Sequence, residues 1–100
     1  MTEQTYFWQE KMANGQIKLG LNQSAREELG QVKYAELPQV DQKLAIGDTL
    51  LAVEAQKMVQ DLPTPIAGRI VATHEALTTT PELLDTDDDQ ENWIAIVDQD

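Results

Sequence analysis

The sequence of 100 residues predicts an all-β fold of the sandwich or barrel kind. Its apolar runs are as short as single strands, and turn signals separate them at intervals of about 8–12 residues, a spacing typical of such folds. Hydrophobic residues make up 41% of the chain, enough for a small core, and Val, Ile and Leu far outnumber the aromatic residues. Because this length suits one compact domain, we expect residues 1–100 to form a single domain.

Turn residues mark where the expected strands begin and end. The first strand follows the Asn14–Gly15 turn signal, and its apolar residues alternate with Lys18 and Gly20, as in a half-buried strand. Pro38 closes the second strand, and the Gly47–Asp48 turn precedes the third. Further prolines and an acidic loop separate the later runs. The expected strands are residues 16–21, 32–37, 49–54, 58–62, 68–73 and 93–97.

Two short helices are expected beside the strands. Ser24 and Glu27 form a capping-box pattern, in which the serine hydroxyl caps the helix and the glutamate carboxylate reaches back. Gly30 then ends a helix that is too short to survive without packing on a sheet. Thr80 as the N-cap and Pro81 at the first helical position predict a second helix. The expected helices are residues 24–29 and 81–84.

The chain is strongly acidic, with 18 acidic and 7 basic residues and a net charge of −11. This charge repels phosphate backbones and anionic lipids, so we expect neither a nucleic acid nor a membrane as partner. The excess follows Lys57, because residues 58–100 carry 10 acidic groups and Arg69 as their single basic one. We therefore expect protein partners with basic surfaces, in contacts that weaken as salt rises.

The composition gives no sign of secretion or of a membrane segment. The start of the chain has no basic region followed by an apolar core, and no run approaches about 18 apolar residues. Without cysteine, the chain has no disulfide, no thiolate nucleophile and no cysteine metal ligand, which fits a reducing compartment. We expect a cytoplasmic protein and a monomer.

Two features with possible chemistry have simpler interpretations. His74 is the single histidine and no nucleophile-elbow sequence accompanies it, so we interpret it as a loop residue after a strand. The acidic run 85–91 places oxygen ligands at alternate positions, as a calcium loop does. Gln90 stands where that loop needs glycine and Ile96 where it needs glutamate, which favours a solvated acidic loop. We assign no catalytic residue and no metal site.

Lys57 lies between two strand-like runs, where the chain is expected to reverse direction. This position puts its ammonium group at the tip of a hairpin, where a modifying enzyme can reach it without unfolding the sheet. Acylation there needs a ligase that supplies an activated acyl group and deprotonates the amine. From the local pattern alone, an ordinary surface lysine is the favoured interpretation.

The segment around Lys57 resembles the modification hairpin of the lipoyl and biotinyl carrier domains. Those domains have a glutamate three residues before the lysine, a proline eight after it and a glycine eleven after it, and Glu54, Pro65 and Gly68 occupy these positions. The biotinyl signature Glu-Ala-Met-Lys-Met is also similar, except that Gln56 replaces its first methionine. A biotin carrier domain modified on Lys57 is therefore the alternative to a lipoyl carrier. An unmodified binding domain on the same fold, which would leave Lys57 bare, is a third.

The rest of the chain resembles the H proteins of the glycine cleavage system, over roughly residues 17–97. Several matched segments in the right order are more specific than one lysine motif. Biotinyl domains are not expected to carry the segments 24–30 and 81–84. The matching segments outside the hairpin are 24–30, 32–38, 75–77, 81–84 and 93–94.

Four features depart from the H-protein pattern. Tyr6–Phe7–Trp8 stands where H proteins have His-Glu-Trp, so that the tryptophan alone is kept. Asp88–Asp89 replaces their Pro-Tyr, and Asn92 replaces the glycine before Trp93. The sequence ends at Asp100, so we expect it to lack the C-terminal helices that H proteins usually add. These features lie around the surface on which the family shelters a loaded arm.

The resemblance implies a flattened barrel-sandwich hybrid of two antiparallel sheets and a non-catalytic carrier with lipoate in amide linkage on Lys57. A lipoate ligase or lipoyltransferase would load it, and we assign Glu54 to ligase recognition or hairpin geometry. In the family, the arm accepts an aminomethyl group from a pyridoxal-phosphate glycine decarboxylase and presents it to a folate-dependent aminomethyltransferase. Dihydrolipoamide dehydrogenase then reoxidises the arm. The departures leave a second role open, in which the protein relays lipoate to other lipoyl enzymes or serves a modification system of its own.

Overall fold

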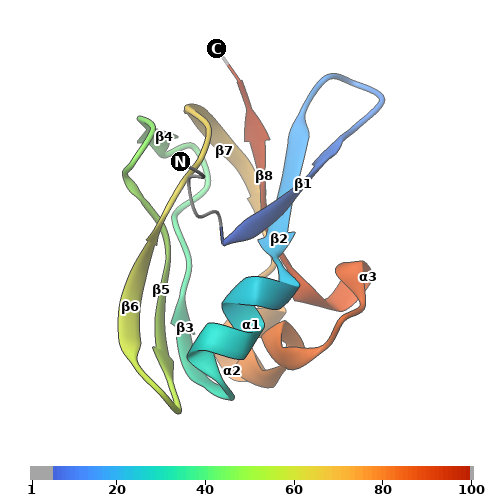
Figure 1. Cartoon of the computed structure of the whole chain (residues 1–100). Helices are drawn as coiled ribbons and strands as arrows, with labels where there is room; N and C mark the ends of the chain where they lie inside the picture. Colours follow the sequence, from blue (N-terminus) through green and yellow to red (C-terminus); the bar gives the residue numbers. More distant parts are fainter. Residues whose placement is uncertain (1–5, 100) are drawn as a thin grey trace, which may run out of the picture.

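The computed structural model describes residues 6–99 of the chain. Their strands form two antiparallel sheets that face each other across the core (Figure 1). Over these residues, one sheet has five strands in the order β1-β2-β8-β7-β4, and the other has three in the order β3-β5-β6. The strands are β1 (Phe7–Lys11), β2 (Ile17–Leu21), β3 (Val32–Glu36), β4 (Lys43–Leu44), β5 (Thr49–Ala55), β6 (Val59–Pro63), β7 (Gly68–Thr73) and β8 (Trp93–Asp98).

Short helices lie towards the end of the sandwich that holds the turn between β5 and β6, whereas the end of β8 and the turn between β1 and β2 lie at the other end (Figure 1). They are α1 (Gln23–Leu29), α2 (Ala76–Thr79), the 3₁₀ helix η1 (Pro81–Asp85) and α3 (Asp89–Asn92). A helix long and apolar enough to cross a bilayer does not occur within residues 6–99.

The expected all-β architecture of two antiparallel sheets is confirmed. No strand within residues 6–99 pairs from one sheet to the other, so the sheets are not closed into a barrel. The molecule is flattened, with principal extents of 35 × 35 × 21 Å. Side chains from the inner faces of both sheets fill the core, where each large aliphatic side chain contributes about 1.5–3 kcal/mol by burial. The most deeply buried include Leu19, Leu51, Leu62, Ile70, Ile94 and Val97.

All six expected strands are present, with ends that differ from the expectation by one residue at most. Two further strands, β1 and β4, were not expected. In β1 the fully buried side chain is Phe7 alone, so the strand lacks the alternation that marks β2. Strand β4 has two residues and is defined by its pairing with β7, which local sequence does not encode.

The capping box expected for α1 is wrong. The N-cap is Asn22, whose Oδ1 accepts a hydrogen bond from the Ala25 amide at 2.8 Å. Since the helix begins before Ser24, that residue is already inside it, and the Glu27 carboxylate accepts from the Gln23 side chain instead. Asparagine caps a helix as well as serine does, and the choice between the two was not visible in the pattern. The expected end of the helix is confirmed.

The second expected helix is present as η1, but it is a 3₁₀ helix that continues to Asp85. Pro81 occupies its first turn as expected, whereas Thr80 makes no capping hydrogen bond through its side chain. The reason is that Thr80 also ends α2, where its backbone amide donates to the Ala76 carbonyl. Helices α2 and α3 have four residues each and were not expected, because one turn leaves little periodicity in a sequence.

Candidate functional site

Strands β5 and β6 form the hairpin that was expected to carry the modified lysine. The Ala55 amide donates to the Met58 carbonyl at 2.9 Å, which closes a tight turn with Gln56 and Lys57 at its tip. Below the turn, Glu54 on β5 lies opposite Val59 on β6. The predicted position of Lys57 at the tip of a hairpin is therefore confirmed for the backbone.

The end of α1 supports this turn from one side. The Gln56 amide donates to the Gln31 carbonyl at 2.8 Å, and the Lys57 amide donates to the Leu29 carbonyl at 3.0 Å. Two backbone hydrogen bonds therefore tie the tip of the hairpin to the last residue of α1 and to the segment that follows it. The turn is held at both ends, by its own strands and by this segment, so its position relative to the sandwich is defined.

Gly30 makes this contact possible. Its φ of 72° is a left-handed conformation that glycine adopts without strain, and it ends α1 with its amide bound to the Arg26 carbonyl. A Cβ at this position would lie 3.3 Å from the Cβ of Gln56 and from the Cγ of Lys57. A glycine here therefore serves both the end of the helix and the close approach of the modification turn.

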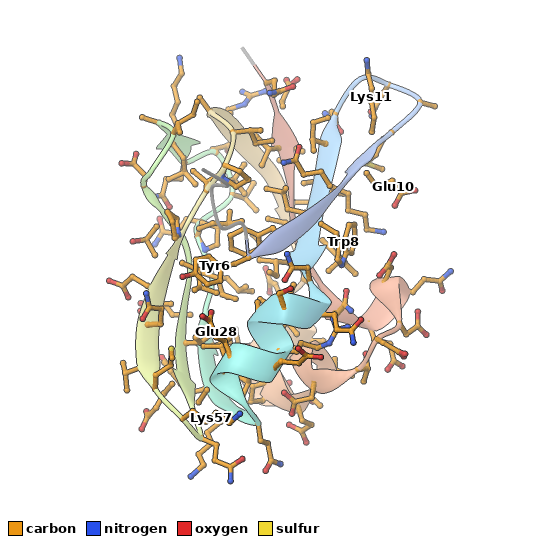
Figure 2. All side chains as sticks on the ribbon, in the orientation of Figure 1. Tyr6, Trp8, Glu10, Lys11, Glu28 and Lys57 are labelled. Atoms are coloured by element: carbon orange, nitrogen blue, oxygen red, sulfur yellow. The ribbon has the colours of Figure 1, made fainter. Side chains whose placement is uncertain are left out.

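The Lys57 side chain is exposed and lies at the C-terminal end of α1 (Figure 2). Its Nζ donates a hydrogen bond to the Glu27 carbonyl at 2.9 Å. The last carbonyls of a helix lack partners within the helix and carry partial negative charge, so a cation is favoured there. The ammonium group thus rests on the helix end and remains open to solvent.

Glu54, the second residue singled out in the sequence, is exposed on β5. It lies opposite Val59 on one side and opposite Tyr34 of β3 on the other. Among residues 6–99 its side chain makes no hydrogen bond and no ion pair, and the Lys57 Nζ donates to the Glu27 carbonyl instead. Its carboxylate is available to a partner.

His74 follows β7 as expected and belongs to a stack of side chains away from the turn. Its Nδ1 lies 2.8 Å from the Trp93 carbonyl oxygen, and its ring stacks on the Trp93 ring at 4.6 Å with an interplanar angle of 4°. The Lys18 Nζ lies 5.2 Å from the centre of the same indole ring. None of these contacts involves the β5–β6 turn, and within residues 6–99 His74 makes no hydrogen bond to a serine or an aspartate.

Residues of the acidic run have structural partners. Asp85 accepts a hydrogen bond from the Val32 amide at 3.1 Å, and Asp88 caps α3 by accepting from the Gln90 amide at 2.9 Å. Partial burial raises the pKa of the Asp85 carboxyl above its ordinary value, and the hydrogen bond from Val32 opposes that rise. Within residues 6–99, no three acidic or histidine side chains gather in a group that could hold a metal ion.

A family model described as "Glycine cleavage H-protein" matches residues 1–100 of the sequence. The chain belongs to the glycine cleavage H-protein family. It is 38% identical over 88 residues to a probable glycine cleavage system H protein of Thermococcus kodakarensis, with 88% of this chain and 65% of that protein covered. The glycine cleavage system H protein of Coprothermobacter proteolyticus is 31% identical over 90 residues, which cover 90% of this chain and 71% of that one. The chain therefore spans about two thirds of the length of these H proteins.

A solved H-protein structure has the same fold. The crystal structure of a glycine cleavage system H protein from Mycobacterium marinum superposes with a TM-score of 0.80, at 29% identity, over 92% of this chain and 76% of that chain. The expected family and its fold are confirmed by these likenesses. The residues of the site, Lys57 and Glu54, remain predictions.

The sequence did not indicate what supports the turn. The carbonyls of Glu27 and Leu29 and the close approach of Gly30 all belong to the end of α1, which precedes the turn by more than twenty residues. A glycine after a helix predicts the end of that helix, but it does not say which distant segment packs against it.

Replacing Gly30 by alanine is expected to lower the free energy of unfolding by about 1–2 kcal/mol, since L-residues are strained in the left-handed region. The added methyl group also presses on Gln56 and Lys57, so their amides are expected to lose protection from hydrogen exchange. Gly47→Ala is the matched control, because Gly47 also has a positive φ, of 96°, but nothing lies within 4 Å of its added Cβ. Equal exchange at the two amides in both variants would contradict the support that we assign to Gly30.

Proposed function

We propose that this chain is a non-catalytic lipoyl carrier of the glycine cleavage type, with lipoate attached in amide linkage to Lys57, and that residues 1–100 act as one carrier domain. The observation that carries the proposal is the Lys57 amine, exposed at the tip of a turn whose backbone is tied to α1. A modifying enzyme can reach this amine without disturbing the sheets. The turn then defines the point from which the arm swings.

The chemistry at Lys57 is an acyl transfer. An ammonium group is not nucleophilic, so the ligase must remove a proton before the Nζ attacks the carbonyl carbon of a lipoyl adenylate. The N–C bond of the amide forms as the C–O bond to the phosphate breaks, AMP leaves, and a second proton passes from the nitrogen to a base. Activation of lipoate by ATP supplies the acyl adenylate, so no oxidant or reductant is needed.

The residues around Lys57 fit such an attachment. The amine is exposed, and the amide that replaces it keeps one N–H for the Glu27 carbonyl. That hydrogen bond changes from a charge-assisted one to a neutral one, which is weaker. Attachment therefore loosens the contact with α1 and favours a mobile arm. When bound, lipoate supplies thiol–disulfide chemistry that a chain without cysteine cannot perform.

The proposed partners follow from the family. A lipoate ligase or lipoyltransferase would load Lys57, and glycine decarboxylase, aminomethyltransferase and dihydrolipoamide dehydrogenase would use the arm in glycine cleavage. We propose a cytoplasmic monomer, since the absence of cysteine fits a reducing compartment.

A second role has one observation in its favour. Phe7 stands where H proteins have the glutamate of His-Glu-Trp, and its side chain is buried in the core. This position therefore offers no carboxylate to a group carried by the arm. That difference is the observation in favour of the second role, a carrier that relays lipoate to other lipoyl enzymes or that serves a modification system of its own.

The intact mass of the protein from its native host tests the proposed attachment. We expect a lipoyl increment on Lys57. A biotin increment instead would select the alternative carrier type, and the bare mass under growth with ample lipoate would exclude both. Neighbouring genes for glycine decarboxylase would favour glycine cleavage over lipoate relay.

Binding between this chain and its ligase is expected to weaken as salt rises, because the chain carries a net charge of −11. Raising the salt from about 0.1 M to about 1 M shortens the Debye length from roughly 10 Å to roughly 3 Å, which screens contacts between exposed charges. We expect the Kd, measured by calorimetry over this range, to rise severalfold. A Kd that does not change with ionic strength would contradict the electrostatic part of the proposal.

A further inference from the structure

The three-stranded sheet turns an acidic and partly apolar face to solvent directly beside Lys57. Residues with exposed or half-exposed side chains line up across β3, β5 and β6 in two rows, one behind the other as seen from the turn. Because side chains alternate along strands, residues two apart on each strand lie on the same face. The first row is Tyr34–Glu54–Val59 and the second is Glu36–Ala52–Asp61. We call these six residues the acidic sheet face.

This face combines charge with large apolar groups in a way that an ordinary solvated sheet face does not. Tyr34 is 55% exposed and Val59 is 76% exposed, on either side of Glu54. At the turn itself, Met58 is 37% exposed. Lys33 is the only basic residue of the three strands, against three carboxylates in the rows. Exposed apolar side chains interleaved with charges of one sign are typical of a binding surface.

A groove of about 440 Å³ extends the face beyond β3. Residues 34–36 of β3 form one wall. The segment from Leu37 to Val40, Thr73 at the end of β7, and Glu75 and Thr78 at and within α2 form the rest. The groove can accept an apolar side chain of a partner next to the Tyr34 ring. The face is therefore hollowed at one edge and reaches the modification turn at its end.

We propose that the acidic sheet face docks the enzyme that acylates Lys57, and that the matching surface of that enzyme carries arginine or lysine side chains around an apolar patch. This inference rests on the proposed function and names its partner. Three carboxylates in two adjacent rows complement a basic surface, and Tyr34 and Val59 supply apolar contacts between them.

The position of the face favours the acylating enzyme over the enzymes that use the arm. An enzyme that acylates Lys57 must bring its reacting atoms to the Nζ, so its surface meets the stem of the hairpin on which Glu54 and Val59 lie. An enzyme that acts on the dithiolane works at the far end of the arm. Such an enzyme does not need to touch the strands next to the attachment point.

Neutralising the face tests this inference against a matched control. One variant combines Glu36→Gln, Glu54→Gln and Asp61→Asn. The control combines Glu10→Gln, Asp89→Asn and Glu91→Gln, which are exposed residues of β1 and α3. Both variants change the net charge from −11 to −8, so they differ in where the charge is removed. Circular dichroism and thermal unfolding establish that both are folded.

The measurement is the rate of acylation by the host's lipoate ligase with lipoate and ATP, followed by intact mass. We expect the face variant to lose about tenfold in kcat/KM at low salt, mostly through KM, and the control to stay within about twofold of the wild type. Equal rates for the two variants would overturn the inference and leave the proposed function standing. No acylation of the wild-type protein would overturn the proposed function itself.

The apolar part has its own matched pair. Val59→Thr keeps the shape of the side chain and replaces one of its methyl groups by a hydroxyl, and Ile46→Thr likewise puts a hydroxyl in place of apolar surface at an aliphatic residue that is 70% exposed before β5. We expect Val59→Thr to raise KM severalfold and Ile46→Thr to leave it unchanged. Once fully lipoylated and reduced with a chemical thiol, the face variant is expected to be reoxidised by dihydrolipoamide dehydrogenase with NAD⁺ at the wild-type rate. Slowing of that step, with acylation unchanged, would assign the face to an arm-using enzyme and overturn the inference.

Discussion

Replacing Lys57 by arginine is expected to abolish lipoylation while leaving the fold intact. Arginine keeps the positive charge and an N–H donor for the Glu27 carbonyl, so the contact with the end of α1 is preserved. A guanidinium group stays protonated at neutral pH and does not attack an acyl adenylate. The intact mass of the variant should therefore equal the mass of the bare chain, and its free energy of unfolding should stay within about 0.5 kcal/mol of the wild type.

Two controls separate this position from the others. Lys33→Arg removes another exposed amine of the same sheet and is expected to leave the lipoyl increment unchanged. The double variant Gln56→Lys with Lys57→Gln moves the amine by one residue, to the side chain that lies against Gly30. Because a small misplacement of a reacting group can cost about 100-fold in rate, we expect this variant to be acylated very slowly. An increment retained in Lys57→Arg would show that the attachment residue lies elsewhere.

The hairpin was predictable because its signals are local. Two apolar runs, a lysine between them and the glutamate, proline and glycine at fixed intervals all lie within residues 50–70. Resemblance over the rest of the chain then indicated the family, which the family match confirms. What could not be predicted is the support of the turn by α1, because it depends on carbonyl groups that every residue has.

The acidic sheet face shows the same limit. The first row combines residues that are far apart in the sequence or separated by the turn, namely Tyr34, Glu54 and Val59. Of these three, only Glu54 belongs to a sequence motif. Only the register of β3, β5 and β6 puts them in one row. Register depends on which residues face the core along whole strands, so it becomes visible once the pairing is known.

Asn92 is a departure from the H-protein pattern whose structural role the sequence did not indicate. Its side chain is fully buried, and both of its polar ends have partners. The Oδ1 accepts from the Trp8 Nε1 at 2.8 Å, and the Nδ2 donates to the Thr86 carbonyl at 2.9 Å. Trp8 lies close over Gly20 of β2, where a Cβ would collide with the indole ring. Asn92 thus links β1, β8 and the loop before α3.

Asn92→Leu is expected to lower the free energy of unfolding by about 2–4 kcal/mol. Leucine is similar in size, but it leaves the Trp8 N–H and the Thr86 carbonyl without their partner, and each buried polar group left unpaired costs about 1–3 kcal/mol. Urea unfolding followed by tryptophan fluorescence measures this loss. Within residues 6–99, the hydrogen bonds of Asn92 go to Trp8 and Thr86 and not to the β5–β6 turn, so the acylation rate of the folded variant should equal that of the wild type.

A double-mutant cycle with Trp8→Phe separates the hydrogen bond from the change in packing. Trp8→Phe removes the donor and leaves the Asn92 Oδ1 unpaired. The double variant removes both the donor and the acceptor, so neither group of this bond is left unpaired. The two single losses should therefore sum to more than the loss in the double variant, with a coupling of about 1–2 kcal/mol. A coupling near zero would mean that the bond between Trp8 and Asn92 contributes nothing. The loss in Asn92→Leu would then come from the unpaired Thr86 carbonyl and the change in packing. The coupling is thus the quantity that decides whether the tryptophan kept from the His-Glu-Trp segment and the asparagine that replaces a glycine act as one pair in holding the start of β8 close to β1.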